Sequence, residues 1–498
     1  MHWMAILSFA FAGYALATGI YVVLQNRRPQ ATLAWMLLFL GLPLAGLLIY
    51  LLFGRDRKAF SRERSLARQD LEANAAPLLR PMRARQDAEI DALEEESPIR
   101  RRLVRLVRRN SHSLLTSQHQ VEIQQDASVH YPSLVADLKA ATRSIHLQYF
   151  IWADDPFTQE LKAILIDRAG AGVAVRLLYD PVGSFPKLTR RYRRELRDAG
   201  VHVAPASALW RLHTLSYRNH RKIAVVDGRI GYTGGMNIGE EHLGGGPYAA
   251  SWRDTQLRIE GEGAAVLQAV FLIDWYNATG EDLFAKDHFP LLGKGTAPVE
   301  APGKSGGESG EEPAVVPVQI LTSGPDSQFR AIRQLYFAMI VSAQDRVRLQ
   351  TPYFIPDPTI AEALKAAALA GVSVEMMVSA KNDGPNPTPN WAGNTYMAEV
   401  AAAGVKVFLY ERGYLHAKTL SVDGEVCSIG SANLDIRSFS INYELNAVLY
   451  DAGLARELEA AFERDLAGCS RFDAVAYAKR PVLHRFRDSA ARLLSPLL

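Results

Sequence analysis

The stretch HRKIAVVDGRIGYTGGMNIG at residues 220–239 decides the fold, because a related stretch, HAKTLSVDGEVCSIGSANLD, returns at residues 416–435. The similarity extends outward from this pair with an offset that stays near 200 residues. Three further pairs match: IHLQYFIW (145–152) with VRLQTPYF (347–354), GVAVRLLYD (172–180) with GVSVEMMVS (371–379), and AGVHV (199–203) with AGVKV (403–407). A near-constant offset predicts one fold that occurs twice in the chain.

Each half alternates short β-branched or aromatic runs with segments of helical pattern, such as YPSLVADLKAATRS (131–144). This alternation predicts an α/β sandwich with a largely parallel sheet. We expect a first lobe over residues 118–292 and a second over 317–498, joined by a flexible Gly-rich linker at 293–316. Two such lobes in one chain predict a pseudo-dimer with a cleft between them.

A histidine, a lysine and an aspartate recur at the spacing HxKxxxxD, each time followed by a turn of small residues and an asparagine. The two sets are His220, Lys222, Asp227 and Asn237 in the first half, and His416, Lys418, Asp423 and Asn433 in the second. The histidines, lysines and aspartates are candidate catalytic residues. The lysines and asparagines are candidate ligands of a phosphate.

Strand geometry gives this spacing its meaning. Residues two apart point to the same face of a strand, so each lysine is expected beside its histidine. The Asp-Gly pair in each copy is typical of a two-residue hairpin turn. Counting back from these turns places His220 opposite Gly235 and His416 opposite Ser431. Each asparagine is therefore expected close to its histidine.

These clusters suit a phosphodiester. Lysine and asparagine supply hydrogen-bond donors that match the non-bridging oxygens of a phosphate. A metal-dependent phosphoryl site would need clustered carboxylates, so we expect no metal and no other cofactor. One imidazole can attack phosphorus while the other protonates the leaving alkoxide. Because each half holds only one such histidine, the two halves must face each other across one site.

Two apolar runs without charged residues open the chain, at residues 3–24 and 31–53. As a helix, either run would reach about 30 Å, the thickness of a hydrocarbon core. A cleaved signal peptide is the alternative for the first run. It fits poorly, because no basic residue precedes the run and a second run follows at once. We expect a two-helix transmembrane hairpin over residues 1–54.

Basic residues flank the second apolar run more densely than the loop before it. The loop contains Arg27 and Arg28, whereas residues 55–68 contain six arginines and lysines. The positive-inside rule therefore predicts that the lobes lie in the cytoplasm. Residues 55–117 form a basic connector, in which RRRLVRLVRR (100–109) suits either a helix lying on anionic lipid or a solvated connector helix.

Composition narrows the function classes. The chain of 498 residues is 48% hydrophobic and carries a net charge of +3, which gives no reason to expect nucleic acid as a partner. Its length allows about three units of roughly 150 residues. Only Cys427 and Cys469 are present, so a thiol-rich metal site and a disulfide framework are both excluded. The oligomeric state is left open.

With these motifs in view, the sequence resembles the phospholipase D superfamily, which is marked by the paired HxKxxxxD motif, and within it the bacterial cardiolipin synthases. The resemblance also rests on ATLAWMLLFLGLPLAGLLIYLLFGRD, LQYFIW, TPYFIP and the closing FRDSAARLLSPLL. It implies two phospholipase D-like lobes on a multi-pass protein of the bacterial inner membrane. It also implies a reaction that joins two phosphatidylglycerol molecules into cardiolipin and glycerol through a phosphohistidine, with anionic phospholipids as partners.

The resemblance implies roles for further residues. A carboxylate downstream of each motif, rather than the motif aspartate, is expected to hold each histidine. Asp254 in SWRDT is the candidate for His220, and Glu444 in NYELN is the candidate for His416. The motif aspartates would then stabilise their turns. The family pattern favours His220 as the nucleophile and His416 as the acid and base, although the residues alone do not separate them. Gly235 departs from the serine that is more familiar at its position.

Three other functions are compatible with parts of this pattern. In a phospholipase D-type hydrolase, water would resolve the intermediate, and only the exclusion of water distinguishes this outcome. A phosphodiesterase or nuclease of the same superfamily is disfavoured by the apolar runs and the near-neutral charge. A non-catalytic membrane scaffold is disfavoured by the intact motifs in both halves.

Overall fold

The computed structural model describes residues 2–25, 29–50, 82–91, 93, 97–207, 216–244, 251–284, 288–289, 315–381 and 386–496. The basic residues on which the predicted orientation rests lie outside these ranges. The same holds for nearly all of the predicted linker at 293–316.

Among the described residues, the first lobe contributes seven strands to the large sheet and packs four α-helices against it. Its strands in the large sheet are β1 (Leu115–Gln125), β2 (Ser144–Tyr149), β3 (Ala174–Tyr179), β4 (His202–Pro205), β5 (Ile223–Val226), β6 (Ile230–Gly234) and β8 (Thr255–Gly261). Its helices are α6 (Ala127–Ala140), α7 (Pro156–Gly170), α8 (Arg190–Asp198) and α9 (Glu262–Thr279).

The second lobe repeats this plan and adds an edge strand. Its strands in the large sheet are β9 (Val316–Ser323), β10 (Arg346–Thr351), β12 (Ser373–Ser379), β13 (Lys406–Tyr410), β15 (Thr419–Val422), β16 (Val426–Gly430), β18 (Glu444–Leu449) and β19 (Cys469–Arg471). Its helices include α10 (Ala331–Ser342), α11 (Pro358–Leu369), α12 (Thr388–Ala402), α14 (Ala452–Leu466), α15 (Ala474–Ala478) and α16 (Val482–Leu493).

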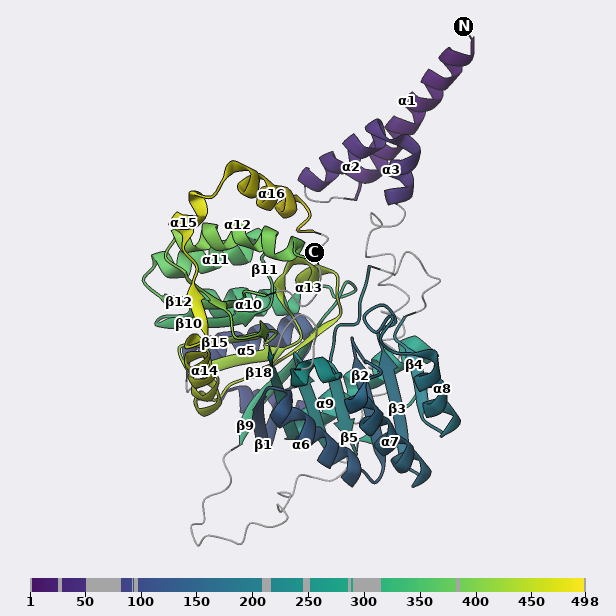
Figure 1. Ribbon diagram of the computed structural model, residues 1–498, viewed down its shortest axis with the longest axis vertical. Helices are drawn as coiled ribbons and strands as arrows, with labels where there is room; N and C mark the ends of the chain where they lie inside the picture. The colour runs from purple at the N-terminus through teal and green to yellow at the C-terminus, as the bar shows by residue number, and fades with distance from the viewer. Residues whose placement is uncertain are drawn as a thin grey trace.

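One hydrogen-bonded sheet runs through both lobes (Figure 1). β1 and β9 pair antiparallel at its centre. Outward from there, the first lobe continues in the order β8-β6-β5-β2-β3-β4 and the second in the order β18-β16-β15-β10-β12-β13. Matched sequence segments therefore occupy matched places in the sheet. This confirms the predicted duplication into two tandem α/β lobes.

The sheet is mixed, so the prediction of a largely parallel sheet is wrong. β2, β3 and β4 run parallel, as do their counterparts β10, β12 and β13. The other neighbouring pairs of each lobe run antiparallel. The reason is local, because tight turns rather than crossover helices connect β5 to β6 and β15 to β16.

Alternating side chains of β5 show how helices cover both faces of the sheet. Ala224 and Val226 pack in one cluster with side chains of α6, α7 and α8, such as Leu161. Ile223 and Val225 pack on the opposite face with Leu267 of α9. Successive residues of a strand point to opposite faces, so both sets are buried only when helices cover both sides. Each lobe is thus an αβα sandwich.

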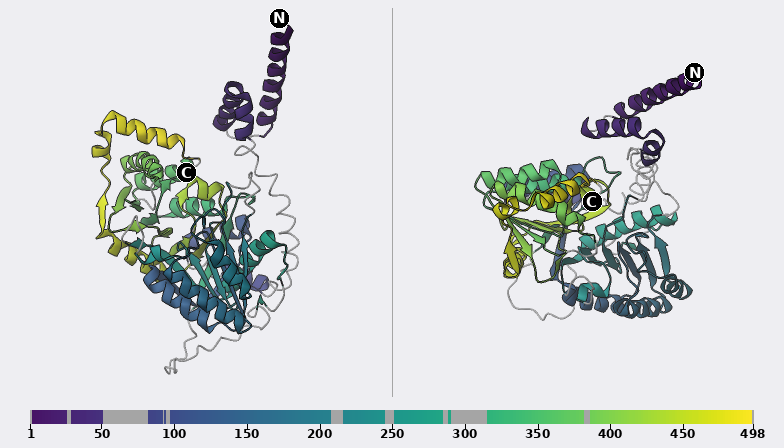
Figure 2. Two further views of the ribbon diagram at one scale, coloured as in Figure 1. Left: turned by 45° about the vertical axis from the view of Figure 1, so that its right-hand side comes forward. Right: turned by 45° about the horizontal axis from the view of Figure 1, so that its top comes forward.

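The N-terminal apolar runs form three helices, α1 (His2–Val23), α2 (Pro29–Gly41) and α3 (Pro43–Ile49), which project beyond the lobes (Figure 2). The second run is interrupted at Leu42, which has φ −135° and ψ 72°, because the following proline lacks an amide hydrogen. The described part of the predicted second span is therefore divided into α2 and α3 at the proline. Among the described residues, none of the helices combines the length and apolarity that crossing a membrane requires.

The arginine-rich segment forms helix α5 (Pro98–Ser111). Its apolar residues Ile99, Leu103, Val104 and Val107 are buried in the core of the second lobe. Protein therefore covers the face that would have to enter a bilayer. The structure favours the connector-helix interpretation over a helix that lies on lipid.

Candidate active site

Backbone hydrogen bonds between the lobes place both motif histidines. His220 and His416 lie in extended segments just ahead of β5 and β15. His220 N donates to Tyr443 O at 2.9 Å, and His416 N donates to Arg253 O at 2.8 Å. Two short strands reinforce the second contact, since β14 (Tyr414–Leu415) pairs in parallel with β7 (Trp252–Arg253). Each histidine is thus held by the backbone of the other lobe.

This arrangement pairs each histidine with a carboxylate from the opposite lobe. His220 Nδ1 lies 3.0 Å from both carboxylate oxygens of Glu444. His416 Nδ1 lies 2.6 Å from Asp254 Oδ2. The predicted pairing, within each lobe, is wrong. Each carboxylate directly follows the residue whose carbonyl binds the other lobe's histidine, and this position cannot be read from the spacing along the chain.

Both carboxylates are buried, but their charges are supported differently. Burial alone would raise the pKa of Glu444, but His220, Lys222 and a hydrogen bond from Ser431 outweigh burial and lower it. For Asp254, burial prevails over the nearby ammonium of Lys418 and raises the pKa. The surroundings of Glu444 therefore favour its carboxylate form, whereas those of Asp254 oppose it.

The histidines are neutral in the empty site. Burial lowers the pKa of His220 to about 4, against the attraction of Glu444 and with added repulsion from Lys222. Burial also lowers the pKa of His416, together with repulsion from Lys418, Lys222 and His220. A neutral imidazole whose Nδ1–H faces a carboxylate carries its lone pair on Nε2. Each Nε2 is then available to attack or to accept a proton.

Each lysine lies beside its histidine, as predicted from the spacing. Lys222 Nζ donates to His220 O at 2.7 Å, and Lys418 Nζ donates to His416 O. Both lysines are buried. Burial lowers the pKa of Lys222 to about 7, against the attraction of Glu444. Two ammonium groups in a buried site provide the charge that an anionic phosphodiester needs.

The two asparagines have different surroundings. Asn237 Oδ1 accepts a hydrogen bond from Ile151 N at 3.2 Å, which turns its amide NH2 group away from that strand end. The amide of Asn433 bonds to Asp435, and its Oδ1 has no partner among the described residues. Contacts of either asparagine with a phosphate stay predictions.

The motif aspartates do not join this cluster. Asp227 accepts hydrogen bonds from the backbone amides of residues 142–144, and Asp423 accepts them from those of residues 344–346. Each lies seven residues past its histidine, which is about 20 Å in extended chain. These contacts fit the turn-stabilising role that the resemblance implies for Asp227 and Asp423, and they do not place either residue among the catalytic groups. They tie the hairpin turn to the loop before β2 or β10.

The turns also correct the predicted register. Val226 pairs with Ile230 and Val422 pairs with Val426, so three residues rather than two separate the strands. The aspartate and glycine of each turn have positive φ, as expected. The residues predicted to face the histidines are consequently displaced by one position.

Several side chains around the histidines were not among the predicted set. Ser431 donates to Glu444, whereas a Cβ at its counterpart Gly235 would lie 2.1 Å from Asp254 Oδ1. Trp252 packs against His416 with ring centres 5.3 Å apart. His242, on the short helix η3 (Glu240–Leu243), lies 6.0 Å from His416 between ring centres. In the sequence, His242 is marked only by its place five residues after Asn237.

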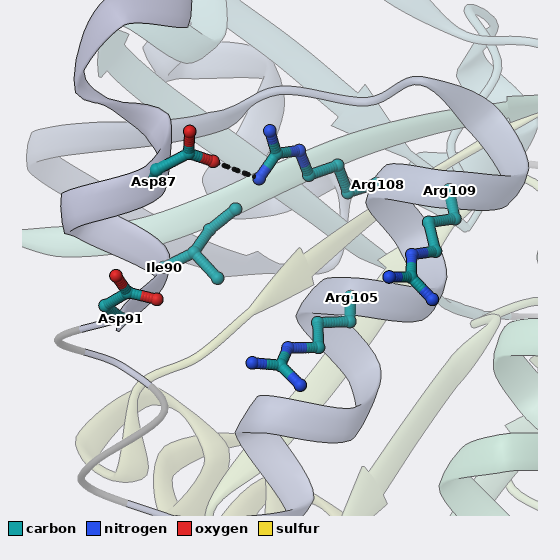
Figure 3. Close-up of a pocket in the computed structure, with 6 residues that line it drawn as sticks. All are labelled: Asp87, Ile90, Asp91, Arg105, Arg108 and Arg109. Atoms are coloured by element: carbon teal, nitrogen blue, oxygen red, sulfur yellow. Dashed lines mark hydrogen bonds and ion pairs between the residues drawn. The ribbon is translucent and has the colours of Figure 1, made fainter.

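A surface pocket lies apart from the histidines (Figure 3). It is formed by residues 82–91 and α5, and Arg108 forms an ion pair across it with Asp87 at 2.6 Å. Basic and acidic side chains both line this pocket, and none of them is a predicted site residue. The candidate active site is therefore the cluster of histidines, lysines and carboxylates between the lobes.

Known proteins share these features. The family described as "Cardiolipin synthase, PLD-like domain" matches residues 134–252 and 336–466, and a "Phospholipase_D-nuclease N-terminal" family matches residues 15–55. A cardiolipin synthase of Geobacillus sp. (strain WCH70) is 39% identical over 96% of this chain and 91% of its own length. The major cardiolipin synthase ClsA of Bacillus subtilis (strain 168) is 35% identical over 99% of both chains.

A solved structure supports the fold. The crystal structure of phosphatidylserine synthase from Haemophilus influenzae Rd KW20 aligns with a TM-score of 0.59 at 15% identity. The alignment covers 80% of this chain and 100% of that one. Fold, paired motifs and near full-length similarity agree, and the chain belongs to the cardiolipin synthase family of phospholipase D-like proteins.

Proposed function

We propose that this protein is a phosphatidyltransferase that joins two molecules of phosphatidylglycerol into cardiolipin and releases glycerol. One observation carries the proposal. Two neutral imidazoles, one from each lobe, lie among two buried lysines, and each is fixed by a carboxylate of the other lobe. One imidazole can attack the phosphodiester, the other can protonate the leaving group, and the two lysines can neutralise the phosphate charge.

In the first step, His220 Nε2 attacks the phosphorus of one phosphatidylglycerol. A P–N bond forms, and the P–O bond to the glycerol headgroup breaks. His416 gives a proton to the departing alkoxide, so that glycerol leaves as a neutral alcohol. The phosphodiester supplies a negative charge beside His416, which favours the protonated imidazole that this step requires.

In the second step, His416 takes the proton from a headgroup hydroxyl of another phosphatidylglycerol. The hydroxyl oxygen attacks phosphorus, the P–N bond breaks, and His220 leaves as a neutral imidazole. Lys222 and Lys418 stabilise the charge on the non-bridging oxygens in both steps. One phosphodiester replaces another, so no nucleotide is consumed.

The supporting groups favour this assignment of the two histidines. Glu444 is held ionised beside His220 and fixes its tautomer for attack. Asp254 holds His416 Nδ1 at 2.6 Å, so Nε2 of His416 faces the site as the group that exchanges a proton with the headgroup oxygen. This difference suits His220 as the nucleophile and His416 as the acid and base.

We also propose that the membrane lies against the side of the molecule that carries α1, α2 and α3. None of these helices contains a charged residue, and Leu16, Leu37 and Leu44 are exposed on them. Helix α16 lies on the same side (Figure 1) and exposes Val482 and Phe486 next to arginines. Apolar and basic side chains together suit an anionic bilayer. With the basic residues at 55–68 in the cytoplasm, protease added to spheroplasts should leave the lobes intact.

The reaction is tested with purified full-length protein and phosphatidylglycerol vesicles in the absence of nucleotide. We expect cardiolipin and glycerol in equal amounts. Phosphatidic acid as the sole lipid product would instead identify a hydrolase. His220→Ala and His416→Ala should each abolish turnover while the protein stays folded by circular dichroism. Near-normal rates in either variant would contradict a shared site.

A further inference from the structure

A third histidine lies at the edge of the site and has no role in the two steps above. His242 is 3% exposed and sits on η3, which directly follows the turn that carries Asn237. Its ring packs against Trp252 with ring centres 4.4 Å apart and lies 6.0 Å from His416. His242 therefore shares a wall of the site with the histidine assigned as acid and base.

The imidazole of His242 lacks the partners that buried polar groups usually have. Both ring nitrogens are buried, and neither has a hydrogen-bond partner among the described residues. An unpaired buried donor or acceptor costs about 1–3 kcal/mol, so such groups are rare in folded proteins. Two unpaired nitrogens on one ring, next to the candidate active site, indicate that a bound ligand supplies the missing hydrogen bonds.

The groups around His242 indicate what kind of ligand this is. Burial is the main cause that lowers the pKa of His242 far below that of a free imidazole; His416, Lys418 and Lys187 act in the same direction, and Asp254 acts against them. The ring is neutral, with one N–H donor and one acceptor nitrogen. It cannot attract an anion as a charged group would. A hydroxyl fits instead, because it both donates and accepts a hydrogen bond.

We propose that His242 binds a hydroxyl of the acceptor's polyol headgroup next to the hydroxyl that attacks phosphorus. The inference rests on the proposed function and extends it to acceptor choice. His416 would take the proton of the attacking hydroxyl, while His242 holds the neighbouring hydroxyl of the same headgroup. Each of these contacts is a hydrogen bond of about 2.8 Å. Two hydroxyls on adjacent carbons are therefore suited to bridge two rings whose centres are 6.0 Å apart.

This subsite would select a polyol over water and over a simple alcohol. A site built to bind a hydroxyl rejects an analogue without it, because the protein group is then left unpaired. His242 is thus a specificity-determining residue that holds the acceptor. It takes no part in bond making at phosphorus.

The test compares two soluble acceptors that differ by one hydroxyl, 1,2-propanediol and 1-propanol, with phosphatidylglycerol as the donor. The full-length enzyme in vesicles should form the phosphatidyl-diol faster than phosphatidylpropanol. His242→Phe should reduce this preference about tenfold, the loss of one hydrogen bond, while transfer to 1-propanol changes less than about twofold. His242→Gln, which keeps a donor and an acceptor, should restore part of the preference.

A matched control is His146→Phe. His146 is also fully buried, but its partner is Gln268 on α9 and it lies against Phe271, outside the site. This variant should keep the wild-type preference even if its stability falls. Equal loss with both acceptors in His242→Phe, or an unchanged preference, would overturn the role of His242. Cardiolipin formation by the wild type, measured in parallel, tests the proposed function separately, because its absence would overturn that function instead.

Discussion

The two lobes share a frame but differ in the side chains that support their histidines. In the second lobe, Ser431 donates to Glu444, whereas in the first lobe Gly235 occupies the matched position and lets Asp254 lie close. Against burial, His220 and Lys222 lower the pKa of Glu444 with a smaller contribution from Ser431, whereas burial prevails at Asp254 and raises its pKa. The crosswise contacts therefore give the two histidines unlike carboxylates, Glu444 at His220 and Asp254 at His416.

This difference shows how a duplicated fold produces two unlike catalytic groups. The repeat supplies two histidines in equivalent places, and the interlobe backbone bonds bring them to one site. Different residues at a few neighbouring positions then give the two histidine–carboxylate pairs different pKa values. The duplicated fold places both histidines in one site. The different groups around each histidine then suit one of them to act as nucleophile and the other as acid and base.

The crosswise carboxylates should produce the largest effects. Glu444→Gln and Asp254→Asn should each slow cardiolipin formation by about 10³-fold, because an amide disturbs the tautomer that the carboxylate fixes. A phosphatidyl ester of p-nitrophenol separates the two variants, since its leaving group needs no acid. With this substrate, the release of p-nitrophenol should stay slow in Glu444→Gln and recover in Asp254→Asn. The opposite pattern would indicate that the carboxylates serve the histidines of their own lobes.

The charge of Lys222 should appear as a pH dependence of substrate affinity. Its pKa of about 7 in the empty site means that the ammonium is lost as pH rises through 7. A bound phosphodiester anion favours the ammonium, so its pKa is higher in the complex. Affinity for short-chain phosphatidylglycerol should therefore fall above pH 7, by up to about tenfold per pH unit.

The matched variant for this dependence is Lys222→Arg. A guanidinium stays charged over this range, so titration calorimetry should show a flat affinity between pH 7 and 9, even if binding is weaker overall. An affinity of the wild type that does not change with pH would contradict the role of Lys222 as a titrating phosphate ligand.

Exchange of the small residues beside the carboxylates should have moderate effects. Ser431→Gly removes a hydrogen bond to Glu444, which should raise the pKa of that carboxyl and slow the reaction severalfold, as for a loss of about 1 kcal/mol. Gly235→Ser places a Cβ within 2.1 Å of Asp254 Oδ1, so the carboxylate must shift. We expect a greater loss of rate in Gly235→Ser than in Ser431→Gly. Steady-state rates with phosphatidylglycerol decide the order, and equal rates in both variants would show that the lobes are interchangeable here.

The motif aspartates should affect turnover least. Asp227→Ala and Asp423→Ala remove hydrogen bonds from three backbone amides each, which should lower the free energy of unfolding by about 2 kcal/mol. The rate at low temperature should stay within about threefold of the wild type. Denaturant titration and initial rates measure the two effects. A loss as large as that of the histidine variants would restore a catalytic role to these residues.

Much of this arrangement could be predicted from the sequence because the repeat and the motif spacing are local patterns. The duplication, the turn at Asp227 and the position of Lys222 beside His220 all follow from short-range geometry. The pairing of His220 with Glu444 could not be predicted, because it depends on how two lobes dock rather than on spacing. His242 was missed because its importance comes from unpaired nitrogens in a folded site. The parallel sheet was wrongly predicted because hairpins and crossovers share similar residue runs.

The most direct test of the central claim follows the phosphatidyl group on the protein. The His416→Ala variant is mixed with the phosphatidyl ester of p-nitrophenol, quenched in alkali and analysed by peptide mass spectrometry. We predict that a phosphatidyl adduct accumulates on His220, because the first lobe's nucleophile still attacks while the second lobe's base is missing. No adduct should form in His220→Ala. An adduct on any residue other than His220, or an adduct on His220 that turns over at the wild-type rate without His416, would contradict one site shared by the two lobes.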